Sequence, residues 1–90
     1  MNTPHALRLD GELTIYRAQE LRQTLLQALA QPGDLQLDLS EVSELDSSAV
    51  QLLLATRLDA LAAGKCFAIP AASEPVRQVL HLMGLGALLH

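Results

Sequence analysis

Aromatic and basic side chains are scarce in this sequence. Its 90 residues include no Trp, one Tyr and one Phe, and six Lys or Arg stand against ten Asp or Glu, for a net charge of −4. Proteins that bind single-stranded nucleic acids stack the bases on aromatic side chains, and binding to any phosphate backbone requires a basic surface. We therefore expect no nucleic-acid partner.

Cysteine and long apolar runs are equally scarce. Cys66 is the only cysteine, which excludes an internal disulfide and a cysteine metal cluster. His5, His81 and His90 lack metal-ligand spacing, so we expect exposed imidazoles and no metal. The glycines of Gly84–Gly86 are too few for a phosphate-binding loop, and we expect no cofactor. No apolar run reaches the roughly 18 residues that cross a membrane. These features predict a cytoplasmic protein without membrane insertion.

The residues that are abundant indicate one small α/β domain over residues 1–90. Half of the chain is hydrophobic, mostly Leu and Ala, so the core must be aliphatic. Period-two alternation or short apolar runs predict strands, and spacing of i, i+3 and i+4 predicts helices. The strands are expected at Ala6–Leu9, Leu35–Leu39 and Lys65–Ile69, and the helices from near Arg17, Ser47 and Glu74. Alternating strands and helices favour a small mixed sheet of about four strands packed with three helices.

Two further segments are open to more than one interpretation. Glu12–Tyr16 is either a short strand or a connection, and Ala87–Leu89 is a last short strand or a frayed turn. Between the strands, Asp10-Gly11 predicts a turn and Ser40–Asp46 an acidic loop. We expect Cys66 to be a small buried side chain in the third strand.

The second and third helices have expected boundaries and buried faces. The second begins at the cap-forming residues before Val50, and the third follows Ser73 as N-cap. The apolar stripe of the second helix is expected to comprise Val50, Leu53, Leu54, Leu58 and Leu61.

No group of residues suggests catalysis. Carboxylates such as Asp10 with Glu12, or Asp38 with Glu41, are typical of solvated strand ends. No nucleophile stands in a pattern that would pair it with a base. We expect a binding module and not an enzyme.

The segment Leu45–Val50 is the exception, because it places two hydroxyls at the start of a helix. One interpretation is structural: Asp46, Ser47 and Ser48 cap the unpaired N–H groups. The other is regulatory, since a phosphoryl group there would face those N–H groups and the positive end of the helix dipole. It would also add negative charge beside Glu41, Glu44 and Asp46, which we expect to be exposed, and would disturb any docked partner.

The order and spacing of several motifs resemble the STAS domain over nearly the whole chain. This family includes anti-sigma factor antagonists and cytoplasmic domains of sulphate transporters. The resemblance lies in Leu9–Leu13 (the "GEL" turn), the Ala18–Leu25 helix, the Leu37–Ser40 strand, Asp46-Ser47-Ser48, Gly64-Lys65 and Val76–Leu85.

The resemblance implies a partner-switching function with Ser47 as phosphoacceptor. It implies that Asp46, Ser47, Ser48 and Ala49 contact a kinase-type anti-sigma or signalling protein, which phosphorylation releases. The chain departs from the family at Ala49–Gln51, where antagonists commonly have Gly-Leu-Gly, and its N-terminus is shorter. Two alternatives therefore stay open: a cytoplasmic subunit that binds the ATPase of an ABC lipid-transport complex, or a component of chemotaxis signalling.

Overall fold

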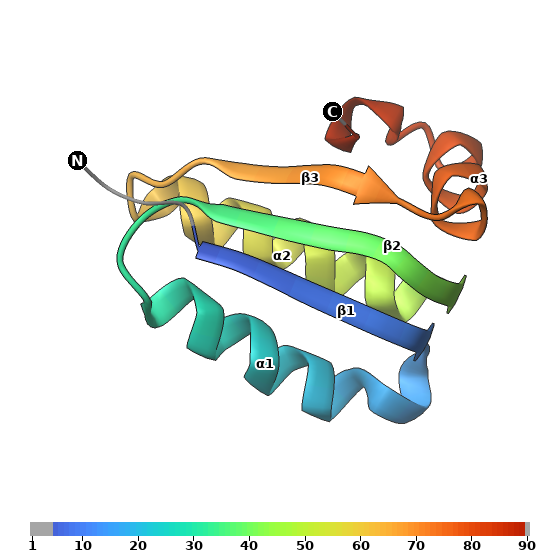
Figure 1. Cartoon of the computed structure of the whole chain (residues 1–90), viewed down its shortest axis with the longest axis horizontal. Helices are drawn as coiled ribbons and strands as arrows, with labels where there is room; N and C mark the ends of the chain where they lie inside the picture. The colour runs from blue at the N-terminus through green and yellow to red at the C-terminus, as the bar shows by residue number, and fades with distance from the viewer. Residues whose placement is uncertain (1–4, 90) are drawn as a thin grey trace.

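The computed structural model describes residues 5–89 and consists of a sheet with helices packed against it (Figure 1). His90 and the side chain of His5 lie outside this description. The elements are β1 (His5–Leu13), the 3-10 helix η1 (Ile15–Arg17), α1 (Ala18–Ala30), β2 (Leu35–Leu45), α2 (Ser47–Ala62), β3 (Phe67–Ala72), α3 (Glu74–Leu82) and the 3-10 helix η2 (Gly86–Leu88).

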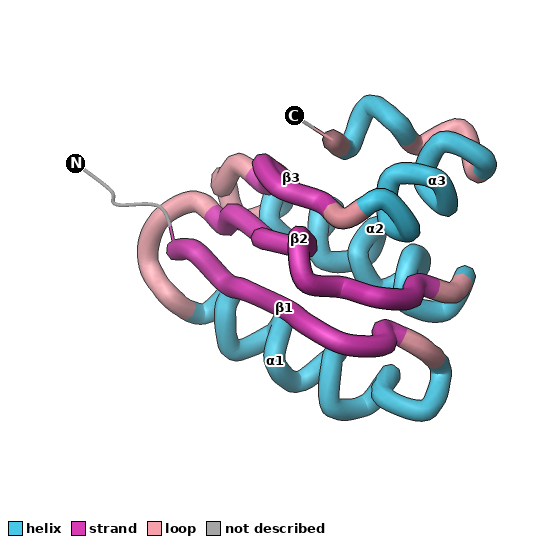
Figure 2. The backbone as a smooth tube through the Cα atoms, turned by 45° about the vertical axis from the view of Figure 1, so that its right-hand side comes forward, coloured by secondary structure: helices cyan, strands magenta, loops and turns pink. Residues whose placement is uncertain are grey.

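The sheet has three strands in the order β1-β2-β3, and both neighbouring pairs are parallel. The chain moves from β1 to β2 and then from β2 to β3, in the same direction across the sheet. Because such connections are right-handed, α1 and α2 lie on the same face of the sheet, where they pack against each other. Figures 1 and 2 show α1 along β1 and α2 behind β2. The α/β class and the three helices are confirmed.

The expected mixed sheet of about four strands is corrected to three parallel strands within residues 5–89. Glu12 and Leu13 extend β1, and the rest of Glu12–Tyr16 leads into η1. At the other end, most of Ala87–Leu89 belongs to η2, and Leu89 alone forms a parallel bridge to Ile69.

Two bulges make β2 longer than the sequence alternation predicts. The register between β1 and β2 shifts between Arg8 and Asp10 and again between Gly11 and Glu12. Each shift gives β2 an extra residue, which changes the spacing of its inward positions from two to three. The expected acidic loop Ser40–Asp46 is therefore strand as far as Leu45. The buried side chains of β2 are Leu35, Leu37, Leu39, Val42 and Leu45.

Gly11 lies at the second irregularity of β1, where a turn was expected. Its φ is +73°, a conformation that side chains disfavour. The guanidinium of Arg17 fills the adjacent space, with Nη1 donating to the carbonyls of Asp10 (2.8 Å) and Glu12 (3.0 Å). The end of β1 is thus held by a side chain from the beginning of the α1 region.

The buried face of α2 differs from the expected leucine stripe. Val50 and Leu53 are buried, but Leu58 and Leu61 are 63% and 50% exposed. Small residues are buried instead, seven and four positions apart on the helix, and they lie on the same side as Leu53. These residues are Ala49, Thr56 and Ala60, and the Thr56 hydroxyl is satisfied by the carbonyl of Leu52.

Cys66 also contradicts its expectation, because it is exposed and precedes β3. Its backbone N–H donates to Asp34 Oδ1 at 2.9 Å. The thiol is therefore not a core group.

The helix α3 follows β3 after a single residue, Ser73, which stays hydrogen-bonded to β2. The last partners of β2 and β3 are Leu39 and Ala72, and Ser73 then donates its N–H to Leu39 O and its hydroxyl to Val42 O. Ser73 occupies the expected N-cap position, but its hydroxyl is used to hold β2 and does not cap the helix. This contact brings Val76 of α3 into the core.

The Gly11–Arg17 contact predicts unequal effects of two Gly→Ala substitutions. Gly64, after α2, has φ +75° and open space around it, so Gly64→Ala should cost only the backbone strain, about 1 kcal/mol. At Gly11 the added methyl would also lie 3.2 Å from Arg17 Nη1 and displace its hydrogen bonds, costing roughly 1 kcal/mol more. Urea unfolding measures both losses, and equal losses would contradict this role of Arg17.

Candidate functional site

The carboxylate of Asp46 organises the C-terminal edge of the sheet, at the right of Figure 1. It is the N-cap of α2, and its Oδ1 accepts from the N–H of Ala49 (3.1 Å) and the hydroxyl of Ser48 (2.5 Å). Its Oδ2 accepts from the N–H of Ile15 at 2.9 Å, and its own N–H donates to Leu13 O. One residue therefore connects the end of β1, through its backbone, with η1 and the first turn of α2, through its side chain.

These hydrogen bonds favour the ionised carboxylate. The Ser48 hydroxyl is the main cause that holds the pKa of Asp46 below its ordinary value, followed by the N–H of Ala49. An acceptor-only group at this position suits the unpaired N–H groups at a helix start.

The two serines have different roles in this geometry. Ser47 is the first residue of α2 and is exposed, as expected, and its hydroxyl makes no hydrogen bond to any residue in the range 5–89. Ser48 is half-buried and its hydroxyl is committed to Asp46. The side chain of Ala49, which was expected to contact a partner, is only 1% exposed and packs in the core.

The carboxylates around this site are mostly exposed, as expected. Glu41 and Glu44 are exposed, whereas Asp46 is half-buried because of its capping bonds. Glu41 pairs with Arg8 at 2.8 Å. Glu44 lies opposite Glu12 in the register, and the hydrogen bond between the two carboxyls raises the pKa of Glu44 above its ordinary value. Negative charge therefore accumulates at Glu12, Glu44 and Asp46, the residue that precedes Ser47.

Two exposed apolar residues beside Ser47 were missed by the sequence analysis. Tyr16 is 93% exposed and Ile15 is 60% exposed, both in η1. The sequence gives one indication of an exposed Tyr16: it is the single Tyr of the chain, and it stands just before a predicted helix at a position that fits no core pattern. A connection without periodicity gives no indication of which side chains point to solvent.

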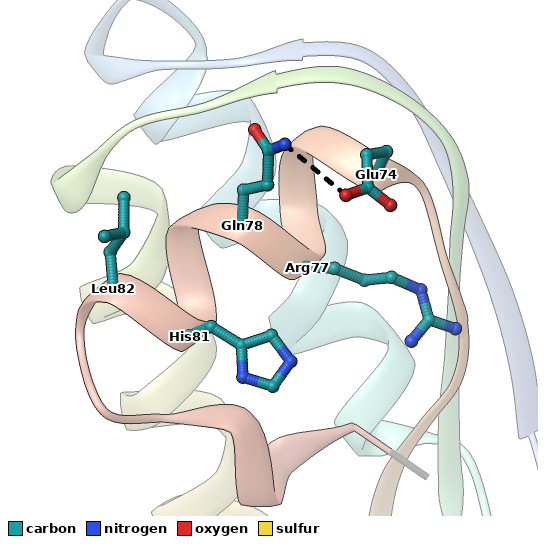
Figure 3. Close-up of a pocket in the computed structure, with 5 residues that line it drawn as sticks. All are labelled: Glu74, Arg77, Gln78, His81 and Leu82. Atoms are coloured by element: carbon teal, nitrogen blue, oxygen red, sulfur yellow. Dashed lines mark hydrogen bonds between the residues drawn. The ribbon is translucent and has the colours of Figure 1, made fainter.

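Several cavities lie along the helices. A shallow groove of about 490 Å³ separates the first turns of α1 and α2 and is lined by Ala18, Gln19, Arg22, Ser48, Gln51 and Leu52. Another, of about 550 Å³, lies on α3, where Gln78 points to Glu74 and His81 is exposed, as expected (Figure 3). The α3 cavity shares no residue with the Ser47 site.

The described residues hold no cluster of three or more His, Cys, Asp or Glu side chains that could bind a metal ion. Over the same range, no helix has the length and hydropathy needed to span a membrane.

The family is decided by a domain model described as "Mlab, STAS domain", which matches residues 2–90. The chain belongs to the STAS family. A search of curated proteins finds no match.

Solved structures extend the likeness of this STAS domain to an anti-sigma factor antagonist. The unphosphorylated form of SpoIIAA matches with a TM-score of 0.81 and 25% identity, over 100% of this chain and 80% of that one. The phosphorylated form of SpoIIAA, a Bacillus cell fate determinant, matches with a TM-score of 0.72 and 25% identity, over 97% and 80%.

The hydrogen bonds of Asp46 predict a pH-dependent stability. Asn in its place keeps one capping oxygen but loses the charge and the bond to Ile15, so Asp46→Asn should lower Tm at neutral pH. Because the folded-state pKa is lowered, the advantage of Asp46 is complete above its unfolded pKa of about 3.9. It is lost as the pH falls through the lower folded-state value.

Thermal unfolding of both proteins from neutral to acid pH measures this difference. The lowered pKa of Asp38 is common to both proteins, whereas the raised pKa of Glu44 depends in part on the charge of Asp46 and moves toward its ordinary value in the variant. A Tm difference that stays constant down to the lowest pH would contradict the ionised cap.

Proposed function

We propose that this STAS domain is a cytoplasmic, non-catalytic partner-switching module of the anti-sigma factor antagonist type. In this scheme the unphosphorylated chain binds a Ser/Thr kinase-type anti-sigma or signalling protein, which supplies ATP. Phosphorylation of Ser47 then dissociates the complex. The observation that carries the proposal is the free, exposed hydroxyl of Ser47 beside the occupied hydroxyl of Ser48.

The position of Ser47 makes phosphorylation compatible with the fold. The group would lie at the N-terminus of a 16-residue helix, where unpaired N–H groups and the dipole favour an anion by roughly 0.3–1 kcal/mol. The carboxylate of Asp46 already accepts from one of these N–H groups and repels a second anion, so the phosphoryl group adds little net stability to the fold. The sheet and the core are not touched.

The same group would act strongly on a docked partner. It adds nearly two negative charges next to Asp46, Glu44 and Glu12, in a contact that excludes water. A partner surface that is complementary to the unmodified acidic edge would have to accommodate the charge and the volume of the phosphoryl group. Phosphorylation therefore switches binding without changing the fold.

The departure from the family at Ala49 does not weaken this proposal. Its methyl group packs in the core under α2, whereas a partner would contact the outer surface of the first turn. An ABC-transport ATPase, or a chemotaxis protein, remains the alternative partner, and the experiments below separate the kinase-type partner from the ATPase.

The assignment of Ser47 is tested by phosphate incorporation. The kinase is the kinase-type protein whose gene lies nearest to the gene of this chain. Ser47→Ala should abolish incorporation, and Ser48→Ala, the matched control, should retain it although it loses the bond to Asp46. Mass spectrometry locates the phosphate. Phosphate on Ser48 in the unaltered protein would overturn the residue assignment.

Binding supplies the second half of the test. Ser47→Asp should keep Tm within a few degrees of the unaltered protein and weaken the complex, whereas Ser47→Ala should bind normally. Should no kinase modify either serine while the protein binds an ABC ATPase, the transport-subunit function would replace the proposed one.

A further inference from the structure

An aromatic side chain stands almost entirely in solvent at the edge that carries Ser47. Tyr16 is 93% exposed, and its neighbour Ile15 is 60% exposed. Single exposed apolar residues are ordinary on protein surfaces. Here, however, the chain places its only Tyr, next to a β-branched residue, at the proposed phosphorylation edge. Tyr is enriched among the few interface residues that carry most of the binding free energy.

The segment with these two side chains is held by several hydrogen bonds. Ile15 N–H donates to Asp46 Oδ2, and Arg17 N–H donates to Thr14 O at 2.9 Å. The Arg17 guanidinium binds two carbonyls at the end of β1. An apolar anchor on a fixed backbone loses little conformational entropy on binding, which favours affinity.

Asp46 makes these anchors and Ser47 parts of one surface. One of its carboxylate oxygens binds η1, and the other binds the first turn of α2. A partner that packs on η1 would therefore lie near the first turn of α2, which begins at Ser47. We call Ile15, Tyr16 and Ser47, with the neighbouring carboxylates, the η1–α2 surface.

The charges of this surface select the kind of partner. Among residues 5–89 the ion pairs are Arg8 with Glu41 and Arg17 with Glu20, so Glu12 and Glu44 have no basic partner. These two carboxyls lie side by side and close to Asp46. A partner that covers them must supply positive charge, and like charge would be rejected.

We propose that the η1–α2 surface binds a protein with an apolar cleft for Tyr16 and Ile15, edged by Lys or Arg side chains that face Glu12 and Glu44. The proposal rests on the proposed function for the existence of a partner. It adds the residues that anchor this partner, and it separates affinity, supplied by Tyr16, from the switch, supplied by Ser47.

Titration calorimetry with two purified probes tests the anchors: the nearest-encoded kinase-type protein and the nearest-encoded ABC ATPase. Tyr16→Ala should weaken binding of the true partner about 30-fold or more, and Ile15→Ala should weaken it less. Leu82→Ala is the matched control, since Leu82 is 87% exposed on α3, and it should leave Kd within about twofold. Because Tyr16 is already in solvent, its loss should leave Tm unchanged.

The charge of the partner is tested by association rates. Glu44→Gln should slow association and reduce its salt dependence, whereas Asp59→Asn, an exposed carboxylate in the last turns of α2, should change neither. An unchanged rate for Glu44→Gln would overturn the basic edge of the cleft.

The outcomes separate this inference from the switch. If Tyr16→Ala binds like the unaltered protein, or Leu82→Ala is equally weakened, the η1–α2 surface is overturned even where Ser47→Asp abolishes binding. If Tyr16→Ala weakens binding and Ser47→Asp does not, the surface stands and the proposed switch fails. Failure of both probes to bind the unaltered protein would overturn both proposals.

Discussion

The arrangement of the C-terminal edge of the sheet depends on one carboxylate. Asp46 accepts from Ile15, Ser48 and Ala49, and in doing so it caps α2, fixes η1 and occupies the hydroxyl of Ser48. Only an ionised, acceptor-only group can satisfy these donors together, which agrees with its lowered pKa. The occupied hydroxyl of Ser48 and the fixed backbone of η1 are both consequences of this group.

The sheet brings Asp46 to this position through its irregularities. Two bulges keep Val42 and Leu45 buried while the outward residues of β2 become a run of polar and acidic groups. Arg17 supports the matching irregularity at Gly11. The apolar core therefore sets the register, and the register places Glu12 against Glu44 beside the start of α2. Packing and surface charge are coupled here through the backbone.

The sequence allows the α/β class, the three helices and the start of α2 to be predicted, because period-two and helical patterns report directly on which side chains are buried. The second half of β2 could not be predicted, since its bulges change the spacing after Leu39 from two to three. The leucine pattern predicts that Leu58 and Leu61 are buried, but both are exposed, and small residues of α2 are buried instead.

For the site, the cap residues indicate Asp46 and Ser47 from type and position alone. Residue types alone could not distinguish Ser47 from Ser48, because the difference depends on a hydroxyl orientation, and only the family resemblance indicated Ser47. Tyr16 lies in a segment without periodicity. Amide hydrogen exchange by NMR tests the central role of Asp46 most directly. Asp46→Ala should accelerate exchange at the N–H groups of Ile15 and Ala49 while leaving β2 protected; unchanged protection at both amides would contradict the account.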